Sequence, residues 1–194
     1  MPRLKKYKYE VIDLFCGIGG LSSGLKSRGF SVLAGYDLDQ TCRYAYETNN
    51  EAVFNYRDIK SVTGQEIAEQ YGKKSVKVLV GYAPCQPFSS YAFKNKKKDP
   101  NKYDLLYEFG RLIREVRPDI VAMENVTQIL RFEEKPVLND FLALLEELDY
   151  QYDVQQVYCP DYGIPQTRKR LVVVASRFGN IRLISPTHNK ENYV

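Results

Sequence analysis

The chain has 194 residues, of which 44% are hydrophobic and 27% charged, and this composition is typical of a folded globular domain. No apolar run approaches the roughly 20 residues that a membrane-spanning helix needs, and residues 1–15 contain no signal-peptide apolar segment. We therefore expect neither secretion nor membrane insertion. The net charge of +4 permits a polyanionic partner without requiring one.

The cysteines and the histidine argue against several chemistries. Cys16, Cys42, Cys85 and Cys159 are far apart and form no CxxC pair, and His188 is the only histidine. Structural zinc sites need clustered cysteine and histidine ligands, and a Ser-His-Asp or Cys-His pair needs a well-placed base. We therefore expect no metal site and no histidine-activated nucleophile.

Short apolar runs alternate with amphipathic segments along the whole chain. This alternation predicts a single α/β domain with a mainly parallel sheet, and ligands of such sheets bind beyond the carboxyl ends of the strands. The expected strands cover residues 11–15, 31–36, 55–59, 76–80, 120–123, 151–159 and 171–175. The expected helices cover residues 21–28, 39–49 with Asp39 as N-cap, 63–71 opened by a Thr63–Glu66 capping box, 104–116, and 136–148 with Pro136 in its first turn.

The first three strand ends carry residues that suit a nucleoside. The first runs into Asp13-Leu-Phe-Cys-Gly-Ile-Gly-Gly20, where glycines allow close approach of a ligand and the next helix offers free N–H groups. Asp37 comes at the end of the second strand, the position at which an acid can hydrogen-bond the two hydroxyls of a ribose. Asp58-Ile59 follows the third and suits an adenine amino group and ring face. Each acid alone is more often a helix cap or a solvated loop residue, but the three positions agree on one ligand.

The fourth strand end places Cys85 between Pro84 and Pro87, in a stiff segment at the ligand edge of the sheet. A free thiol has a pKa near ~8.5, so a nucleophile there needs activation. The basic run 94–98 could supply positive potential, although such runs are more often solvated loops.

The remaining strands contribute an acid and two arginines. Glu124, at the end of an apolar strand, could have a raised pKa and act as an acid toward a ring nitrogen, or it could cap a helix. Arg168 and Arg170 alternate on an extended segment and therefore point the same way. Their forked donors could reach a carbonyl oxygen or a phosphate.

In this order the segments DLFCGIGG, Asp37, Asp58-Ile59, PCQPFS, ENV and QTRKR resemble the cytosine-5 DNA methyltransferases, from about residue 10 to residue 187. The resemblance implies a Rossmann-like methyltransferase fold, with a mainly parallel twisted sheet, helices on both faces and an antiparallel last strand. It also implies S-adenosylmethionine as methyl donor, no metal, and a cytosine flipped out of double-stranded DNA as substrate.

The resemblance also assigns roles to residues. Cys85 would attack C6 of cytosine to form a covalent adduct, and Glu124 would hold or protonate N3. Arg170 would contact the base carbonyl oxygen, and Arg168 would support the loop or the adduct. The expected donor-site residues are Asp13, Phe15, Gly17, Gly19, Asp37, Leu38, Asp58, Ile59, Pro84 and Leu105. The expected substrate-binding residues are Gln86, Ser89, Asn125 and Gln166. Leu38 stands where the family often has a tryptophan.

Family members continue beyond the last strand with a target-recognition domain and two further motifs. We therefore expect residues 1–194 to be an incomplete catalytic domain, cytoplasmic and, in a bacterium, nucleoid-associated. A second polypeptide would supply target recognition in a restriction-modification system, unless the chain is a truncated piece. Two alternatives remain open, methylation of cytosine in transfer RNA and a non-catalytic remnant that only binds the donor.

Overall fold

A computed structural model of the chain describes residues 7–84, 104–131, 136–189 and 191. The chain divides into two compact units, one of residues 1–82 with 108–121 and the other of residues 83–107 with 122–194. Each unit is described by itself below.

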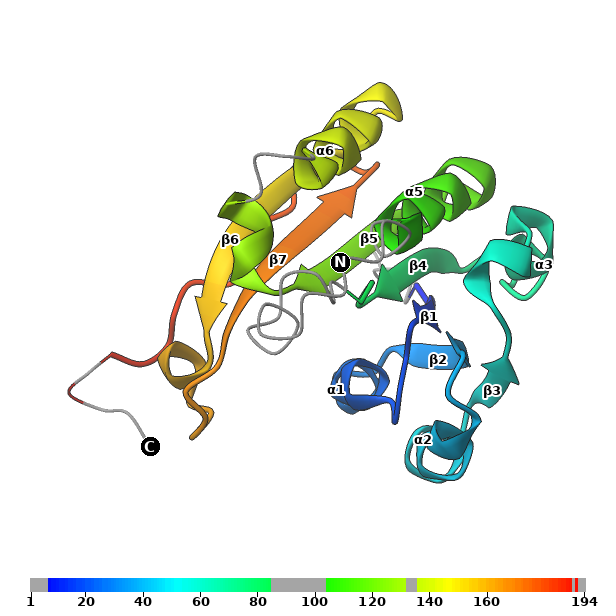
Figure 1. Cartoon of the computed structure of the whole chain (residues 1–194), viewed down its shortest axis with the longest axis horizontal. Coiled ribbons are helices and arrows are strands. Elements are labelled where there is room, and N and C mark those ends of the chain that lie inside the picture. Colours follow the sequence, from blue (N-terminus) through cyan, green and yellow to red (C-terminus); the bar gives the residue numbers. More distant parts are fainter. Residues whose placement is uncertain (1–6, 85–103, 132–135, 190, 192–194) are drawn as a thin grey trace, which may run out of the picture. The chain divides into compact units, whose positions relative to one another are not determined.

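Seven strands form one sheet in the order β3-β2-β1-β4-β5-β7-β6 (Figure 1). They are β1 (Tyr9–Leu14), β2 (Ser31–Asp37), β3 (Val53–Tyr56), β4 (Val76–Gly81), β5 (Ile120–Asn125), β6 (Gln151–Tyr158) and β7 (Lys169–Ser176). The helices are α1 (Gly20–Ser27), α2 (Arg43–Asn50), α3 (Gly64–Ala68), α5 (Asp104–Val116) and α6 (Val137–Glu147). Short 3-10 turns are η1 (Gln40–Cys42), η2 (Ile59–Ser61), η5 (Thr127–Arg131) and η6 (Cys159–Tyr162).

In the first unit, β1 lies between two parallel neighbours. It pairs with β2 and with β4, and β2 pairs in parallel with β3. Five of the six β1 residues are buried, as expected for a parallel strand that is covered on both faces. Because parallel strands end at the same edge, the segments that follow β1, β2 and β3 lie at one edge of this part of the sheet.

In the second unit, β6 and β7 pair antiparallel along their whole length, from Gln151 opposite Ser176 to Tyr158 opposite Lys169. Leu171, Val173 and Ala175 are buried on one face of β7. The predicted α/β class, with a mainly parallel sheet and an antiparallel last strand, is confirmed.

Several element boundaries differ from the predictions; β3, for example, covers Val53–Tyr56 and not residues 55–59. Asp39 caps a 3-10 turn, with the Thr41 amide donating to Asp39 Oδ1 at 3.0 Å, so α2 begins only at Arg43. The Thr63–Glu66 capping box is present, but α3 ends at Ala68 and not near residue 71. Pro136 precedes the first turn of α6 and does not lie within it.

No helix in the described part of the chain is long and apolar enough to cross a membrane.

Candidate active site

The loop that follows β1 has an unusual backbone. Phe15, Gly17 and Gly19 have φ angles of 60°, 50° and 87°, in the left-handed region that favours glycine. A Cβ on Gly19 would collide with the side chains of Asn50 and Tyr46, whereas a Cβ on Gly17 would meet nothing within 4 Å. Gly19 is therefore required by packing inside the protein, and Gly17 leaves open space on the loop.

Asp37 lies directly beside this loop. Its Oδ2 accepts a hydrogen bond of 2.8 Å from the Gly17 amide, and its Oδ1 accepts one of 2.9 Å from the Asp39 amide. Gly17 and Asp37, which are 20 positions apart and were predicted to bind the same ligand, are thus in contact. The carboxylate is held in place by backbone donors and keeps further lone pairs for hydroxyl donors.

Asp13 lies beneath the loop and is only 1% exposed. Its Oδ2 accepts a hydrogen bond of 2.7 Å from Ser22 Oγ, which lies 3.1 Å from the Tyr46 hydroxyl oxygen. Burial raises the pKa of Asp13 to about 7, against the hydrogen bonds from Ser22. Asp13 therefore supports the loop from inside, and its contacts with Ser22 and Tyr46 were not predicted.

Asp58 and Ile59 open the turn η2 at the end of β3. Asp58 is exposed, and its Oδ1 accepts a hydrogen bond of 2.9 Å from the Lys60 amide. Ile59 is only 4% exposed, whereas Leu38 is 58% exposed. Asp58 and Leu38 therefore offer their side chains at the surface of the first unit, while Ile59 is packed into it.

In the second unit, Glu124 meets both predicted arginines. Its Oε1 lies 3.3 Å from Arg168 Nη2, which donates a hydrogen bond to it, and 2.9 Å from Arg170 Nε. The Arg170 contact is an ion pair without an aligned hydrogen bond. The other oxygen, Oε2, is buried and has no hydrogen-bond partner among the described residues.

The protonation of Glu124 reflects two opposing influences. Burial raises its pKa, and the hydrogen bond and positive charges of Arg168 and Arg170 lower it. Burial prevails, so the pKa of Glu124 lies above its ordinary value. A carboxyl group of this kind retains its proton to higher pH than an exposed glutamate and can donate it to a ring nitrogen.

Asn125 is fully buried at the end of β5. Its Nδ2 donates a hydrogen bond of 3.3 Å to the Ala83 carbonyl oxygen, and its Oδ1 accepts one of 2.8 Å from the Val126 amide. Asn125 therefore anchors the backbone at the exit of β4. Pro84 and Leu105 are half-buried and Gln166 is exposed, while Cys85, Gln86 and Ser89 lie outside the described residues.

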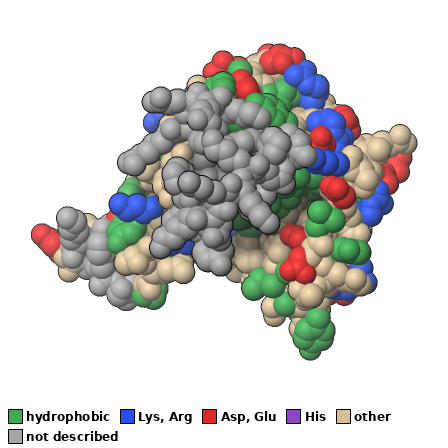
Figure 2. Space-filling view, viewed as in Figure 1, with side chains coloured by type: hydrophobic (Ala, Val, Ile, Leu, Met, Phe, Trp, Pro, Cys, Tyr) green, Lys and Arg blue, Asp and Glu red, His purple; other side chains and the backbone are tan. Residues whose placement is uncertain are grey.

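The first unit fits a nucleoside methyl donor such as S-adenosylmethionine. Gly17 leaves open space, Gly19 begins α1 without any side-chain cap, and no acidic residue occupies the first turn of that helix. Free N–H groups at a helix start suit a carboxylate, and the Asp37 and Asp58 carboxylates suit hydroxyl and amino donors. In the view of Figure 2, basic and acidic side chains are interspersed over the described surface.

The chain is similar to known DNA methyltransferases over most of its length. The profile of the family described as C-5 cytosine-specific DNA methylase matches residues 9–193. Type II methylase M.HgiDII of Herpetosiphon aurantiacus is 51% identical over 183 residues, which are 94% of this chain and 51% of that protein. Type II methyltransferase M.AquIA of Picosynechococcus sp. is 29% identical over 195 residues, with 94% of this chain and 78% of that protein covered.

A crystal structure of a DNMT2 variant from Spodoptera frugiperda superposes with a TM-score of 0.70 and 26% identity, over 88% of this chain and 50% of that one. The predicted Rossmann-like methyltransferase fold is thereby confirmed. The chain spans about half the length of M.HgiDII and of this structural neighbour. The match over nearly all of its residues shows that the chain belongs to the C-5 cytosine-specific DNA methylase family.

Proposed function

We propose that this chain is the catalytic part of a type II restriction-modification methyltransferase that transfers a methyl group from S-adenosylmethionine to C5 of cytosine in DNA. The family match and the type II methylases among its relatives support the reaction class. The observation that carries the proposal is the state of Glu124, with one oxygen held by two arginines and the other buried without a hydrogen-bond partner among the described residues.

Glu124 is suited to hold the cytosine ring. Arg168 and Arg170 fix Oε1, so the orientation of the carboxyl group is set before a ligand binds, and Oε2 has no hydrogen-bond partner in the described part of the chain. Because burial raises the pKa of Glu124, the carboxyl group can place its proton on N3. When a nucleophile bonds to C6, the electrons of the C5–C6 double bond shift toward N3. The proton on N3 neutralises the charge that arrives there, and C5 becomes nucleophilic.

Cys85 is the proposed nucleophile. Its thiolate forms a bond to C6, and C5 takes the methyl group from the sulfonium sulfur, which leaves as the thioether of S-adenosylhomocysteine. Loss of the C5 proton to water, return of the N3 proton to Glu124 and departure of the thiolate restore the aromatic ring. Asn125 supports this step from a distance, because its bond to the Ala83 carbonyl fixes the backbone two residues before Cys85.

The donor supplies an electrophilic methyl carbon on a sulfonium sulfur. The residues of the first unit bind and orient it. Asp37, fixed by the Gly17 and Asp39 amides, accepts hydrogen bonds from the ribose hydroxyls, and Asp58 accepts one from the adenine amino group. Leu38 and Phe15 offer apolar surface at the same edge of the sheet.

Target choice, in this proposal, depends on a recognition domain. M.HgiDII is about twice the length matched, whereas M.AquIA is covered to 78%, so relatives of both lengths exist. We propose that a second polypeptide, or a continuation of the same one, carries the recognition domain. Double-stranded DNA with a flipped cytosine is the proposed substrate.

Transfer of a labelled methyl group tests the proposal. The chain is assayed alone and together with the proposed second polypeptide that carries the recognition domain (the companion chain). The substrates are duplex DNA and transfer RNA, and Cys85→Ser and Glu124→Gln are assayed beside the wild type. We expect labelled 5-methylcytosine in DNA, none with Cys85→Ser, and at least a ~100-fold lower rate with Glu124→Gln.

The matched control is Glu146→Gln, because Glu146 is an exposed carboxylate of the same unit that accepts a hydrogen bond from the Tyr152 hydroxyl. It should transfer methyl groups at the wild-type rate. Methylation of transfer RNA alone would contradict the DNA substrate. Donor binding without transfer to either polymer, with and without the companion chain, would favour the remnant alternative.

A further inference from the structure

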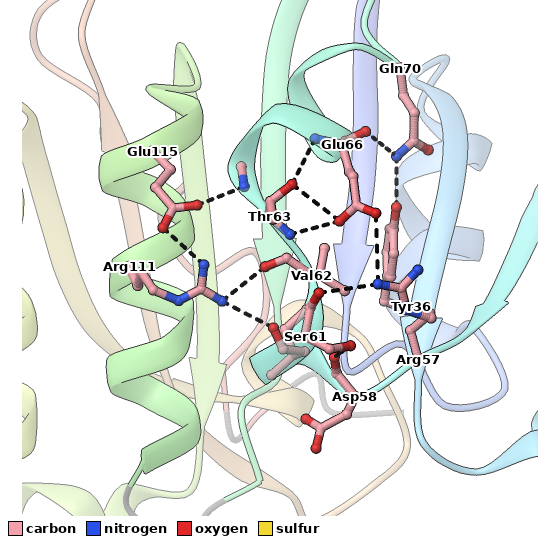
Figure 3. A network of polar contacts seen from close by, with 12 residues as sticks. Tyr36, Arg57, Asp58, Ser61, Val62, Thr63, Glu66, Gln70, Arg111 and Glu115 are labelled. Atoms are coloured by element: carbon pink, nitrogen blue, oxygen red, sulfur yellow. Dashed lines mark hydrogen bonds and ion pairs between the residues drawn. The ribbon is translucent and has the colours of Figure 1, made fainter.

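Arg111 of helix α5 reaches the turn that carries Asp58. Its Nη2 donates hydrogen bonds of 3.1 Å to the Ile59 carbonyl oxygen and 3.0 Å to the Val62 carbonyl oxygen (Figure 3). One guanidinium nitrogen therefore bridges both ends of η2, although Arg111 is about 50 positions later in the sequence. Both partners belong to the same compact unit as Arg111.

Two carboxylates hold Arg111 in this position. Its Nε donates to Glu108 Oε2 at 2.7 Å, and its Nη1 donates to Glu115 Oε1 at 2.9 Å. All three nitrogens of the planar fork are therefore engaged, a pattern that lysine cannot reproduce. Burial raises the pKa of Glu115, but the bonds from Arg111 and the Gly64 amide outweigh it and lower the pKa below its ordinary value. Glu115 is thus a stable anion beside the guanidinium.

Glu115 also fixes the residue that follows the turn. Its Oε2 accepts a hydrogen bond of 2.7 Å from the Gly64 amide, and a Cβ on Gly64 would collide with the Glu115 side chain. The Thr63–Glu66 capping box secures the same point. Arg57 donates to the Ser61 carbonyl at 3.1 Å from the other side. The backbone from Ile59 to Gly64 is thus fixed at several successive peptide groups.

Asp58 stands at the start of this fixed segment and points away from it in Figure 3. The amide of Lys60, inside the segment, donates to Asp58 Oδ1 at 2.9 Å, and Ser61 Oγ donates to the Asp58 carbonyl at 2.7 Å. The direction of the Asp58 carboxylate therefore depends on the conformation of η2, which Arg111 bridges.

We propose that Arg111 is a positioning residue that sets the selectivity of the donor site for adenine, by fixing η2 and thereby the carboxylate of Asp58. The inference rests on the proposed function, in which Asp58 accepts a hydrogen bond from the adenine amino group. Hypoxanthine has a carbonyl oxygen in place of that amino group. A fixed carboxylate rejects it, because two acceptors then face each other, whereas a mobile carboxylate can turn away.

The test is calorimetric titration with S-adenosylhomocysteine and with its analogue in which hypoxanthine replaces adenine. The ratio of the two dissociation constants is the readout, and it needs no methyl transfer. We expect the wild type to prefer the adenine compound by about 100-fold, and Arg111→Met to reduce that preference to about 10-fold or less. Arg111→Lys should fall between the two, because a lysine can reach one carbonyl oxygen but cannot form the fork.

Arg114→Met is the matched control, since Arg114 is an exposed arginine of the same helix, and it should keep the wild-type ratio. Titrations are made well below each variant's melting temperature, and Arg111→Lys serves if Arg111→Met does not fold. An unchanged ratio, whether or not both compounds bind more weakly, would overturn the role of Arg111. A wild-type chain that binds neither compound would contradict the proposed function itself.

Discussion

The side-chain amide of Asn125 donates a hydrogen bond to the carbonyl oxygen of Ala83 across 3.3 Å. Asn125 is 0% exposed and Ala83 1% exposed, so water cannot replace this bond. The bond ties the end of β5, where Glu124 lies, to the backbone just before Cys85. The proposed acid and the proposed nucleophile are thus linked through two neighbouring residues of the same unit.

Replacement of Asn125 by alanine should therefore damage catalysis more than folding. The buried Ala83 carbonyl loses its partner, at a cost of about 1–3 kcal/mol, and the half-buried Val126 amide loses its partner as well. We expect a lower melting temperature together with a loss of methyl transfer beyond what the unfolded fraction explains. Thermal unfolding and single-turnover assays on the same samples measure both effects.

Asn55→Ala is the appropriate comparison, because Asn55 Nδ2 makes the same kind of bond, at 3.4 Å, to the Gly35 carbonyl oxygen in the other unit. It should lower stability without a separate effect on turnover. Equal losses of turnover at matched stability in both variants would mean that Asn125 has a structural role only.

Gly19→Ala should destabilise the protein far more than Gly29→Ala. Both glycines have nearly the same left-handed backbone, with φ angles of 87° and 86°, so both substitutions incur about 1–2 kcal/mol of backbone strain. Only Gly19 also faces Asn50 and Tyr46, which a Cβ would strike, while Gly29 faces open space. Urea unfolding of the two variants separates the steric term, and equal destabilisation would contradict the packing argument.

The sequence was sufficient to place residues at the ends of parallel strands. Asp37 and Gly17 were predicted to share a ligand because successive strand ends meet at one edge of the sheet, and the 2.8 Å bond between them agrees with that reasoning. The ion pairs of Glu124 with Arg168 and Arg170 were not predicted, because the two arginines were expected to reach a carbonyl oxygen or a phosphate.

Contacts that depend on how helices pack could not be predicted in this way. Ser22 and Tyr46 look like ordinary helix residues in the sequence, yet they meet Asp13 in the interior. Arg111 belongs to a helix with several charged residues, and nothing in its spacing shows that it turns toward Ile59. Side-chain periodicity indicates which face of a helix is buried but not which distant backbone groups a long side chain reaches.

The buried carboxyl of Asp13 should make folding stability depend on pH. Burial raises its pKa from 3.8 to about 7, so between these values the folded state holds a proton that the unfolded state has lost. Stability is therefore highest at the acid end of this interval and falls as the pH rises through it, by up to about 1.4 kcal/mol per pH unit. Above about pH 7 both states are ionised and this contribution levels off.

Asp13→Asn removes the titrating group, and its amide oxygen can still accept a hydrogen bond from Ser22. Urea unfolding between about pH 4.5 and pH 7.5 should show a flatter profile for this variant than for the wild type. Asp39→Asn controls for charge, because hydrogen bonds from the Thr41 side chain and amide lower the pKa of this exposed acid. Its profile should match the wild type, and a slope that survives in Asp13→Asn would contradict the assignment.

Removal of Arg168 should move the pH dependence of methyl transfer to higher pH. Burial raises the pKa of Glu124, and the hydrogen bond and charge of Arg168 partly oppose that rise. Without the guanidinium the carboxyl group ionises at a still higher pH. If the protonated form of Glu124 serves N3, the alkaline fall of the single-turnover rate should shift to higher pH in Arg168→Ala, even though the maximal rate is lower.

Arg177→Ala, a change at an exposed arginine just beyond β7, should leave the alkaline limb in place. A fall at unchanged or lower pH in Arg168→Ala would mean that a group other than Glu124 controls that limb.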